Sequence, residues 1–203
     1  WVNTGEIAGN GIDDDGNGYV DDRNGYDVSD DDANVNPPSV TENHAHGTLT
    51  AGVAGAATNN SLGVASVGRR TKLMLIKASS NSATQPGLDS SPEGIDYAIT
   101  TLPDVISMSY GGPDLFTFEA DLMNAAHDAG IVLVASSGND GTLDVMYPAG
   151  HDVVIAVGAT QFNNQMADFS NHGTWIDVVA PGVLMPTTSV TGNTAYEDFS
   201  GTS

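Results

Sequence analysis

The chain has 203 residues, enough for one domain with a substantial core and too few to require two. Its formal net charge of −21, from 26 acidic and 5 basic residues, argues against nucleic acid and against an anionic membrane as partners. The lack of cysteine excludes disulfides, thiolate nucleophiles and zinc–thiolate sites. No apolar run approaches the ~20 residues that span a bilayer.

The first part of the chain is acidic. Residues 1–43 hold 11 of the 26 acids and one basic residue, Arg23. They are rich in Gly and Asn and lack apolar periodicity, so we expect ligands or packing against the rest of the chain to order them. The domain 1–203 thus divides into an acidic region, 1–43, and an α/β core, 44–203.

The spacing of apolar residues predicts three helices and four strands in the core. The helices are expected at Thr48–Ala57, Pro92–Thr101 (with Ser91 as its N-cap) and Phe118–Ala129, and the strands at Lys72–Ala78, Asp104–Ser109, Ile131–Ser136 and Val153–Ala159. This alternation is typical of a parallel sheet with helices on both faces. Ligands bind at the carboxyl ends of such strands, which here are followed by Ser109–Gly112 and Ser136–Asn139.

Three residues are candidates for chemistry. His46 is expected to open a helix, where the helix dipole disfavours the imidazolium and keeps the base neutral. Asn139 follows a strand and could donate its amide to a developing oxyanion. Ser203 ends the run Phe-Ser-Gly-Thr-Ser. Each alone has an ordinary explanation as a surface histidine, a turn asparagine or a serine in a common tripeptide.

A series of short motifs, taken in order, makes the chain resemble the subtilisin-like serine proteases, the subtilases. The motifs are HGTLTAG, SYGG, ASSGNDG, YPAG, VIAVGAT, FSNHG, VVAPG and SGTS, within residues 44–203. The resemblance implies an α/β, three-layer subtilisin-like fold with a mainly parallel central sheet flanked by helices on both faces. It also implies a secreted serine endopeptidase that hydrolyses peptide bonds in proteins through an acyl-enzyme intermediate.

The resemblance implies a role for each matching residue. His46 would be the general base, Ser203 the nucleophile and Asn139 the side-chain oxyanion donor, joined by the backbone N–H of Ser203. Substrate binding would fall to two walls of a pocket that accepts large apolar side chains. The residues of the walls are Ser109, Tyr110 and Gly111, which would pair with an extended substrate, and Ser136, Ser137 and Gly138 opposite them.

The sequence departs from the subtilase pattern near the catalytic motifs. The family's catalytic aspartate lies in Asp-Thr/Ser-Gly before the histidine, and no such sequence precedes His46. The chain also begins at Trp1 without methionine and stops at Ser203, where the family continues with Met-Ala and a buried helix. We therefore expect a fragment of a longer product, with the catalytic aspartate before Trp1 and little activity in these residues alone. Leu49-Thr50 replaces the family's usual His-Val and is expected to affect packing only.

The acidic region contains oxygen ligands spaced as in a calcium loop. In the run DDDGNGYVDD, the predicted ligands are the side chains of Asp13, Asp15, Asn17 and Asp21 and the carbonyl of Tyr19. Hard oxygen donors without sulfur or histidine favour Ca²⁺ over zinc. The usual bidentate Glu is absent, because its position is Asn24. The alternative is an acidic surface loop that binds counterions loosely.

Two further segments are candidate calcium sites. Asp27–Asn34 could form a second, weaker site. Residues 58–64 resemble the family's tight calcium loop, which implies a side-chain oxygen from Asn60 and carbonyls from Thr58, Leu62 and Val64. All of these ions would be structural, because they neutralise carboxylates and order loops that have little apolar core.

A second function stays open, namely a catalytically inactive, calcium-stabilised subtilase-like binding domain. An α/β-hydrolase esterase would need Gly-x-Ser-x-Gly before the histidine, and the nucleotide-binding patterns GxxxxGK and GxGxxG are equally absent. The resemblance further implies protein or peptide substrates, a monomer, and a propeptide in the full-length precursor.

Overall fold

The computed structural model describes residues 1–38, 42–83 and 87–203, and for residues 42–44 it describes the backbone but not the side chains. Three helices and eight strands lie within those ranges. The helices are α1 (Glu42–Gly55), α2 (Ser91–Thr101) and α3 (Thr117–Asp128). The strands are β1 (Gly25–Asp27), β2 (Leu75–Lys77), β3 (Val105–Met108), β4 (Val132–Ser136), β5 (Val154–Thr160), β6 (Val178–Pro181), β7 (Met185–Thr188) and β8 (Tyr196–Phe199).

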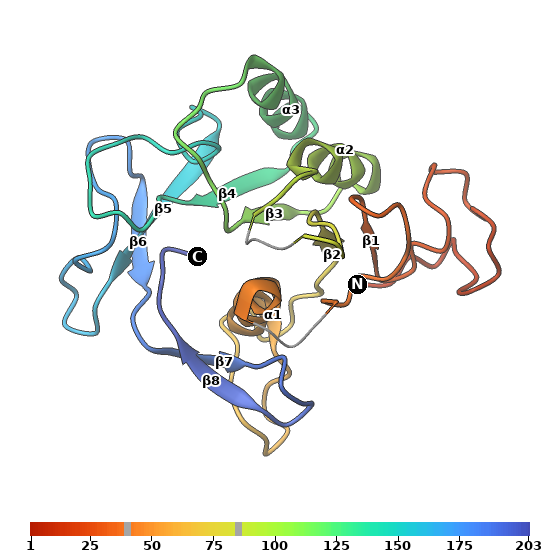
Figure 1. Ribbon diagram of the computed structural model, residues 1–203, viewed down its shortest axis with the longest axis horizontal. Coiled ribbons are helices and arrows are strands. Elements are labelled where there is room, and N and C mark those ends of the chain that lie inside the picture. Colours follow the sequence, from red (N-terminus) through yellow and green to blue (C-terminus); the bar gives the residue numbers. More distant parts are fainter. Residues whose placement is uncertain (39–41, 84–86) are drawn as a thin grey trace.

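A four-stranded parallel sheet forms the centre of the molecule, with the strand order β3-β4-β5-β6. Helices α2 and α3 lie together on one side of it, and α1 lies on the other side (Figure 1). The predicted α/β class with a parallel sheet is therefore confirmed. Among the described residues, no helix is both long and apolar enough to cross a membrane.

Alternation along the strands determines which face of the sheet is covered. In β3, Ile106 and Met108 are buried, whereas Val105 and Ser107 are exposed. The buried side chains join one core cluster with Ile95 of α2 and Met123 of α3. A strand with one apolar face packs that face against helices, so α2 and α3 complete this side of the core.

Two smaller strand pairs lie outside this sheet. β1 and β2 are parallel, and a Cβ on Gly25 would lie 1.8 Å from the carbonyl oxygen of Leu75, so only glycine fits there. β7 and β8 are antiparallel. The β7 hydroxyls hold α1, since Thr187 Oγ1 donates to the carbonyl of Leu49 (2.6 Å) and Thr188 Oγ1 donates to that of Thr48 (3.0 Å).

The helix that contains His46 is longer than expected. It begins at Glu42 rather than Thr48, so His46 is a residue inside the helix and the prediction that it opens the helix is wrong. No Gly or Pro lies between Glu42 and His46 to stop the helix earlier. The N-cap of α2 is Ser90 instead of Ser91, and its side chain makes no capping hydrogen bond. Sequence analysis missed β1 and β6–β8, which are short.

Candidate active site

His46 and Ser203 form a hydrogen-bonded pair although 157 positions separate them. His46 Nε2 lies 3.1 Å from Ser203 Oγ. The His46 ring also meets the Phe199 ring edge-to-face at 5.6 Å between centroids. Burial lowers the pKa of His46 below its usual value, because the charged form loses hydration. The imidazole is thus kept neutral by burial, in the form that can accept a proton from the serine hydroxyl.

Asn139 presents its amide group at the same place. Its Oδ1 accepts hydrogen bonds from the Thr202 backbone N–H (2.9 Å) and from Thr202 Oγ1 (3.0 Å). Because a backbone N–H can only donate, the side-chain oxygen must face Thr202 and the Nδ2 group must point the other way. Nδ2 donates to no described residue of the protein, so it is free to donate to a ligand.

A cavity of about 300 Å³ connects these residues. Its lining consists of His46, Ser109, Tyr110, Gly111, Ser136, Gly138, Asn139, Asp140, Met146 and Ser203. Five of the six predicted substrate-wall residues are therefore present. The sixth, Ser137, is fully buried and donates its hydroxyl to the carbonyl of Asn171 (3.4 Å).

Hydrogen bonds fix the wall that contains Ser109, Tyr110 and Gly111. Ser109 Oγ donates to the carbonyl of Ser203 (3.1 Å). Gly112 and Tyr147 exchange both backbone hydrogen bonds, at 2.9 and 2.8 Å, next to the wall residue Gly111. A Cβ on Gly111 would lie 3.7 Å from the Met146 Cβ, and one on Gly138 would lie 3.0 Å from its Cγ. Met146 therefore lies between the two walls, a position that sequence analysis did not single out.

No carboxylate among the side chains that the structure describes is paired with His46. The buried Asp27 is instead paired with Lys77, as is Asp30 (3.3 Å). Nearby, Asp31 accepts the phenol of Tyr26 (2.9 Å). The acids of the candidate segment Asp27–Asn34 thus have partners within the protein, and no described acid orients the histidine.

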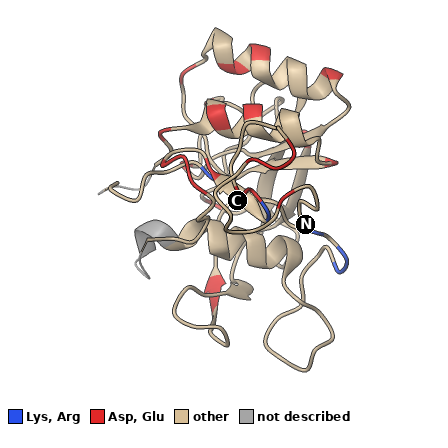
Figure 2. Ribbon diagram, turned by 90° about the vertical axis from the view of Figure 1, so that its right-hand side faces the viewer, with Lys and Arg blue, Asp and Glu red and all other residues tan. Residues whose placement is uncertain are grey.

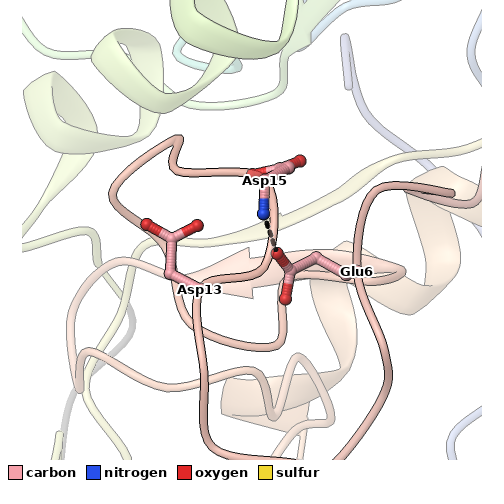
Figure 3. Close-up of side chains that lie close together, drawn as sticks. All are labelled: Glu6, Asp13 and Asp15. Carbon is pink, nitrogen blue, oxygen red and sulfur yellow. Dashed lines mark hydrogen bonds between the residues drawn. The ribbon is translucent and has the colours of Figure 1, made fainter.

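The acidic N-terminal region brings three carboxylates together. Asp and Glu are spread along its loops (Figure 2). Oxygens of Glu6, Asp13 and Asp15 lie within 4.8 Å of one another (Figure 3). Glu6 is 2% exposed, and its Oε1 accepts the N–H groups of Asp14 (2.8 Å) and Asp15 (3.2 Å). This cluster could hold a metal ion, and the donors are all hard oxygens.

Hydrogen bonds from the loop stabilise the charge on Asp13. The N–H groups of Gly16, Asn17 and Gly18 all donate to it at 2.8–3.1 Å. These hydrogen bonds lower the pKa of Asp13, and the bond from Gly18 has the largest effect. The carboxylate is therefore ionised and suited to a cation.

Two other predicted ligands of this loop, Asn17 and Asp21, make hydrogen bonds to other groups of the protein. Asn17 donates to Asp22 Oδ2 (3.0 Å) and accepts the N–H of Tyr19 (2.8 Å). Asp21 accepts the N–H groups of Asn10 (3.1 Å) and Gly11 (2.9 Å). Glu6 takes part in the cluster although it precedes the calcium-loop pattern, so no spacing rule could have indicated it.

In the predicted calcium loop at residues 58–64, left-handed backbone alternates with other conformations. Asn59, Ser61 and Gly63 have φ of 62°, 62° and 46°. Asn60 Oδ1 accepts the N–H of Leu62 (3.1 Å). A Cβ on Gly63 would lie 1.8 Å from the Tyr196 ring, so this position requires glycine for both reasons. Thr58, Leu62 and Val64 remain predicted ligands.

The curated proteins most similar in sequence include several proteases. A thermophilic serine proteinase of Bacillus sp. (strain AK1) is 40% identical over 158 residues, covering 78% of this chain and 39% of its own length. Subtilisin Savinase of Lederbergia lenta is 37% identical over 166 residues, covering 82% and 60%. The chain thus spans between about two fifths and three fifths of these relatives.

Solved structures agree. The psychrophilic subtilisin-like protease Apa1 from Pseudoalteromonas sp. AS-11 has a TM-score of 0.68 and 30% identity, covering 83% of this chain and 42% of that one. The prenylagaramide maturation protease PagA has a TM-score of 0.70 over 77% and 58%, and at 22% identity it supports the fold alone. The sequence model described as the subtilase family matches residues 6–203, which include the acidic region as well as the core. The chain therefore belongs to the subtilase family of serine proteases.

Proposed function

We propose that this chain is part of the catalytic domain of a serine endopeptidase that cleaves proteins through an acyl-enzyme intermediate. The observation that carries the proposal is the 3.1 Å approach of His46 Nε2 to Ser203 Oγ. A nucleophile within hydrogen-bond reach of a neutral base is the arrangement that acyl transfer requires. We infer further that the whole domain has the three-layer subtilisin-like arrangement.

Each proton has a place in this chemistry. Ser203 Oγ attacks the scissile carbonyl carbon while His46 accepts the hydroxyl proton. The tetrahedral intermediate collapses when His46 returns that proton to the leaving amine, which leaves the acyl group on Ser203. A water molecule then repeats the sequence and releases the acid product.

The developing oxyanion would be stabilised by Asn139 Nδ2 together with the Ser203 backbone N–H. The hydrogen bonds from Thr202 to Asn139 Oδ1 support this assignment, because they hold the amide in one orientation before the substrate arrives. A donor that is already oriented needs no reorganisation at the moment of reaction.

The substrate would bind as an extended strand beside Ser109, Tyr110 and Gly111. The side chain before the scissile bond would enter the cavity between this wall and the segment 136–138. Because Met146 lies between the walls, we propose that it limits the depth of this pocket. The preferred side chain is then apolar, with its size set by Met146.

We further propose structural Ca²⁺ in the acidic region. Glu6, Asp13 and Asp15 would bind the ion, and Asn17, Tyr19 and Asp21 remain candidate ligands of the same loop. The support comes from three hard-oxygen donors within 4.8 Å, one of them buried. A second ion would bind at Thr58, Asn60, Leu62 and Val64. Neither ion takes part in the reaction.

The lack of a described carboxylate partner for His46 favours one alternative, a calcium-stabilised binding domain without activity. An imidazole with no carboxylate to hold its tautomer retains only weak catalysis. For the active enzyme, we propose that the acid comes from outside these 203 residues. Secretion, a propeptide and a monomeric state also remain proposals.

Labelling the full-length protein with a fluorophosphonate separates the two functions. The active enzyme is expected to be modified at Ser203, and the His46→Ala variant to be modified far more slowly. As a matched control, the exposed His127→Ala variant should label as the unmodified protein does. A folded full-length protein that resists labelling would support the inactive binding domain.

A further inference from the structure

Asn171 is a fully buried asparagine in the segment that follows β5. Its side chain reaches the loop that carries Asn139. Asn171 Oδ1 accepts the N–H of Asp140 (2.9 Å) and, more weakly, that of Thr142 (3.4 Å). Its own backbone N–H donates to the carbonyl of Gly138 (3.0 Å). Asn171 therefore binds the residues immediately before and after Asn139.

Neighbours of Asn171 strengthen the same attachment. The Gly141 N–H donates to the carbonyl of Phe169 (2.8 Å), and the His172 N–H donates to that of Thr142 (2.9 Å). Segments 138–142 and 169–172 are thus joined along their length. The side chain of Asn171 binds the backbone after Asn139, whereas Thr202 Oγ1 accepts the N–H of Gly138 before it (3.2 Å).

The amide nitrogen of Asn171 shows that the contact is unusual. Nδ2 is buried and has no hydrogen-bond partner among the described residues. A Cβ on Gly138 would lie 2.7 Å from this nitrogen, so the close approach depends on glycine. Burying an unpartnered donor is unfavourable. The useful part of the Asn171 side chain is therefore its oxygen, which accepts two N–H groups that would otherwise lack partners.

We propose that Asn171 is a positioning residue for the oxyanion donor Asn139. Thr202 fixes the orientation of the Asn139 amide, and Asn171 fixes the backbone from which that side chain extends. The inference rests on the proposed peptidase function. It implies that loss of the Asn171 oxygen moves Asn139 Nδ2 away from the oxyanion without altering the walls that bind the substrate.

The test uses the full-length enzyme and a peptide p-nitroanilide with an apolar residue before the scissile bond. Asn171→Leu removes the acceptor at similar size, and Asn171→Asp keeps an oxygen in its place. We expect Asn171→Leu to lower kcat by about 10- to 100-fold at nearly constant KM, since small displacements of a catalytic group can cost that much. Asn171→Asp should retain more kcat than Asn171→Leu. Asn163→Leu, in an exposed loop of the same β5–β6 connection, should leave both constants unchanged.

A double-variant cycle identifies the route of the effect. If Asn171 acts through Asn139, then Asn139→Ala with Asn171→Leu should lose little more kcat than Asn139→Ala alone. The proposal would be overturned if the kcat loss of the double variant equalled the product of the two single losses. A rise in KM with kcat unchanged in Asn171→Leu would also overturn it. Should Asn171→Leu fail to fold, Asn171→Ser, whose shorter side chain cannot reach both N–H groups, serves in the same cycle.

An inactive full-length protein would instead contradict the peptidase function and leave the positioning role to be judged by structure. In that case, a crystal structure of the Asn171→Leu variant is the readout. A shifted Asn139 amide would support the positioning role, and an amide that keeps its hydrogen bonds to Thr202 in the same place would overturn it.

Discussion

The phenol of Tyr97 donates a hydrogen bond to Asp22 Oδ2 at 2.8 Å, and both residues are fully buried. Tyr97 belongs to α2 and Asp22 to the acidic N-terminal region, so this contact joins the two parts of the domain. Asp22 also accepts the side-chain amides of Asn3 (2.6 Å) and Asn17 (3.0 Å). The acidic region is therefore attached to the core by Asp22, a buried polar group with three donors.

Tyr97→Phe should destabilise the full-length protein by about 1.5–3 kcal/mol, because it removes a buried hydrogen bond to a charged group. Chemical denaturation measures the change in the free energy of unfolding. Tyr196→Phe removes a phenol from a residue that is 39% exposed and is expected to change it little. Equal effects of the two substitutions would contradict the assigned importance of the Tyr97–Asp22 bond.

Calcium removal should lower the melting temperature of the full-length protein. An ion present at about 1,000 times its Kd contributes about 4 kcal/mol, which corresponds to roughly 10 °C for a domain of about 200 residues. Glu6→Gln should reduce the shift on chelation, because it weakens the buried ligand of the cluster. Asp152→Asn, at an exposed acid, should leave the shift intact. A melting curve that is the same with and without EGTA would rule out these structural ions.

The lowered pKa of His46 has a definite consequence for residues 1–203. The folded chain keeps the imidazole neutral at a pH where the unfolded chain, near its usual value of about 6.5, already binds a proton. Stability linked to His46 is thus present above that value and falls as the pH decreases below it. An NMR titration of the ring, assigned with His46→Gln, should give a midpoint below 6.5. A midpoint at or above that value would contradict the effect of burial.

Asn139→Ala should lower kcat of the full-length enzyme with little change in KM. Removing the side-chain oxyanion donor from a subtilisin costs about 10²–10³ in kcat, and we propose the same role for Asn139 here. Steady-state kinetics provide the test, with Asn163→Ala as the exposed control. An Asn139→Ala enzyme with unchanged kcat would remove Asn139 from the oxyanion site.

Met146→Gly should deepen the substrate pocket. We expect kcat/KM for a peptide with a large aromatic side chain before the scissile bond to rise by about 10-fold relative to one with alanine, since each added methylene in a pocket is worth about 1–3 kcal/mol. Leu143→Gly alters a nearby residue that is 68% exposed and should leave the ratio unchanged. The same ratio in the Met146→Gly enzyme would show that Met146 does not limit the pocket.

The periodic elements of the core could be predicted because their signals are local. The expected helix Phe118–Ala129 is shifted by one residue at each end relative to α3. The expected strand Ile131–Ser136 begins one residue before β4 and ends at the same residue. β6 was missed because it is short and its sequence, VVAP at Val178–Pro181, shows no alternation of polar and apolar residues. Its place in the sheet depends on pairing with β5, which is a tertiary contact.

The sequence by itself determined the α/β class and the candidate residues His46, Asn139 and Ser203, because motif order and short-range periodicity are properties of the chain. Only the tertiary structure decided which groups meet. It placed Glu6 beside Asp13, which no loop spacing indicates. It also placed Asn171 within hydrogen-bond distance of Asp140, the residue after Asn139. Such contacts depend on segments far apart in the chain being packed to within hydrogen-bond distance, and local patterns do not contain that information.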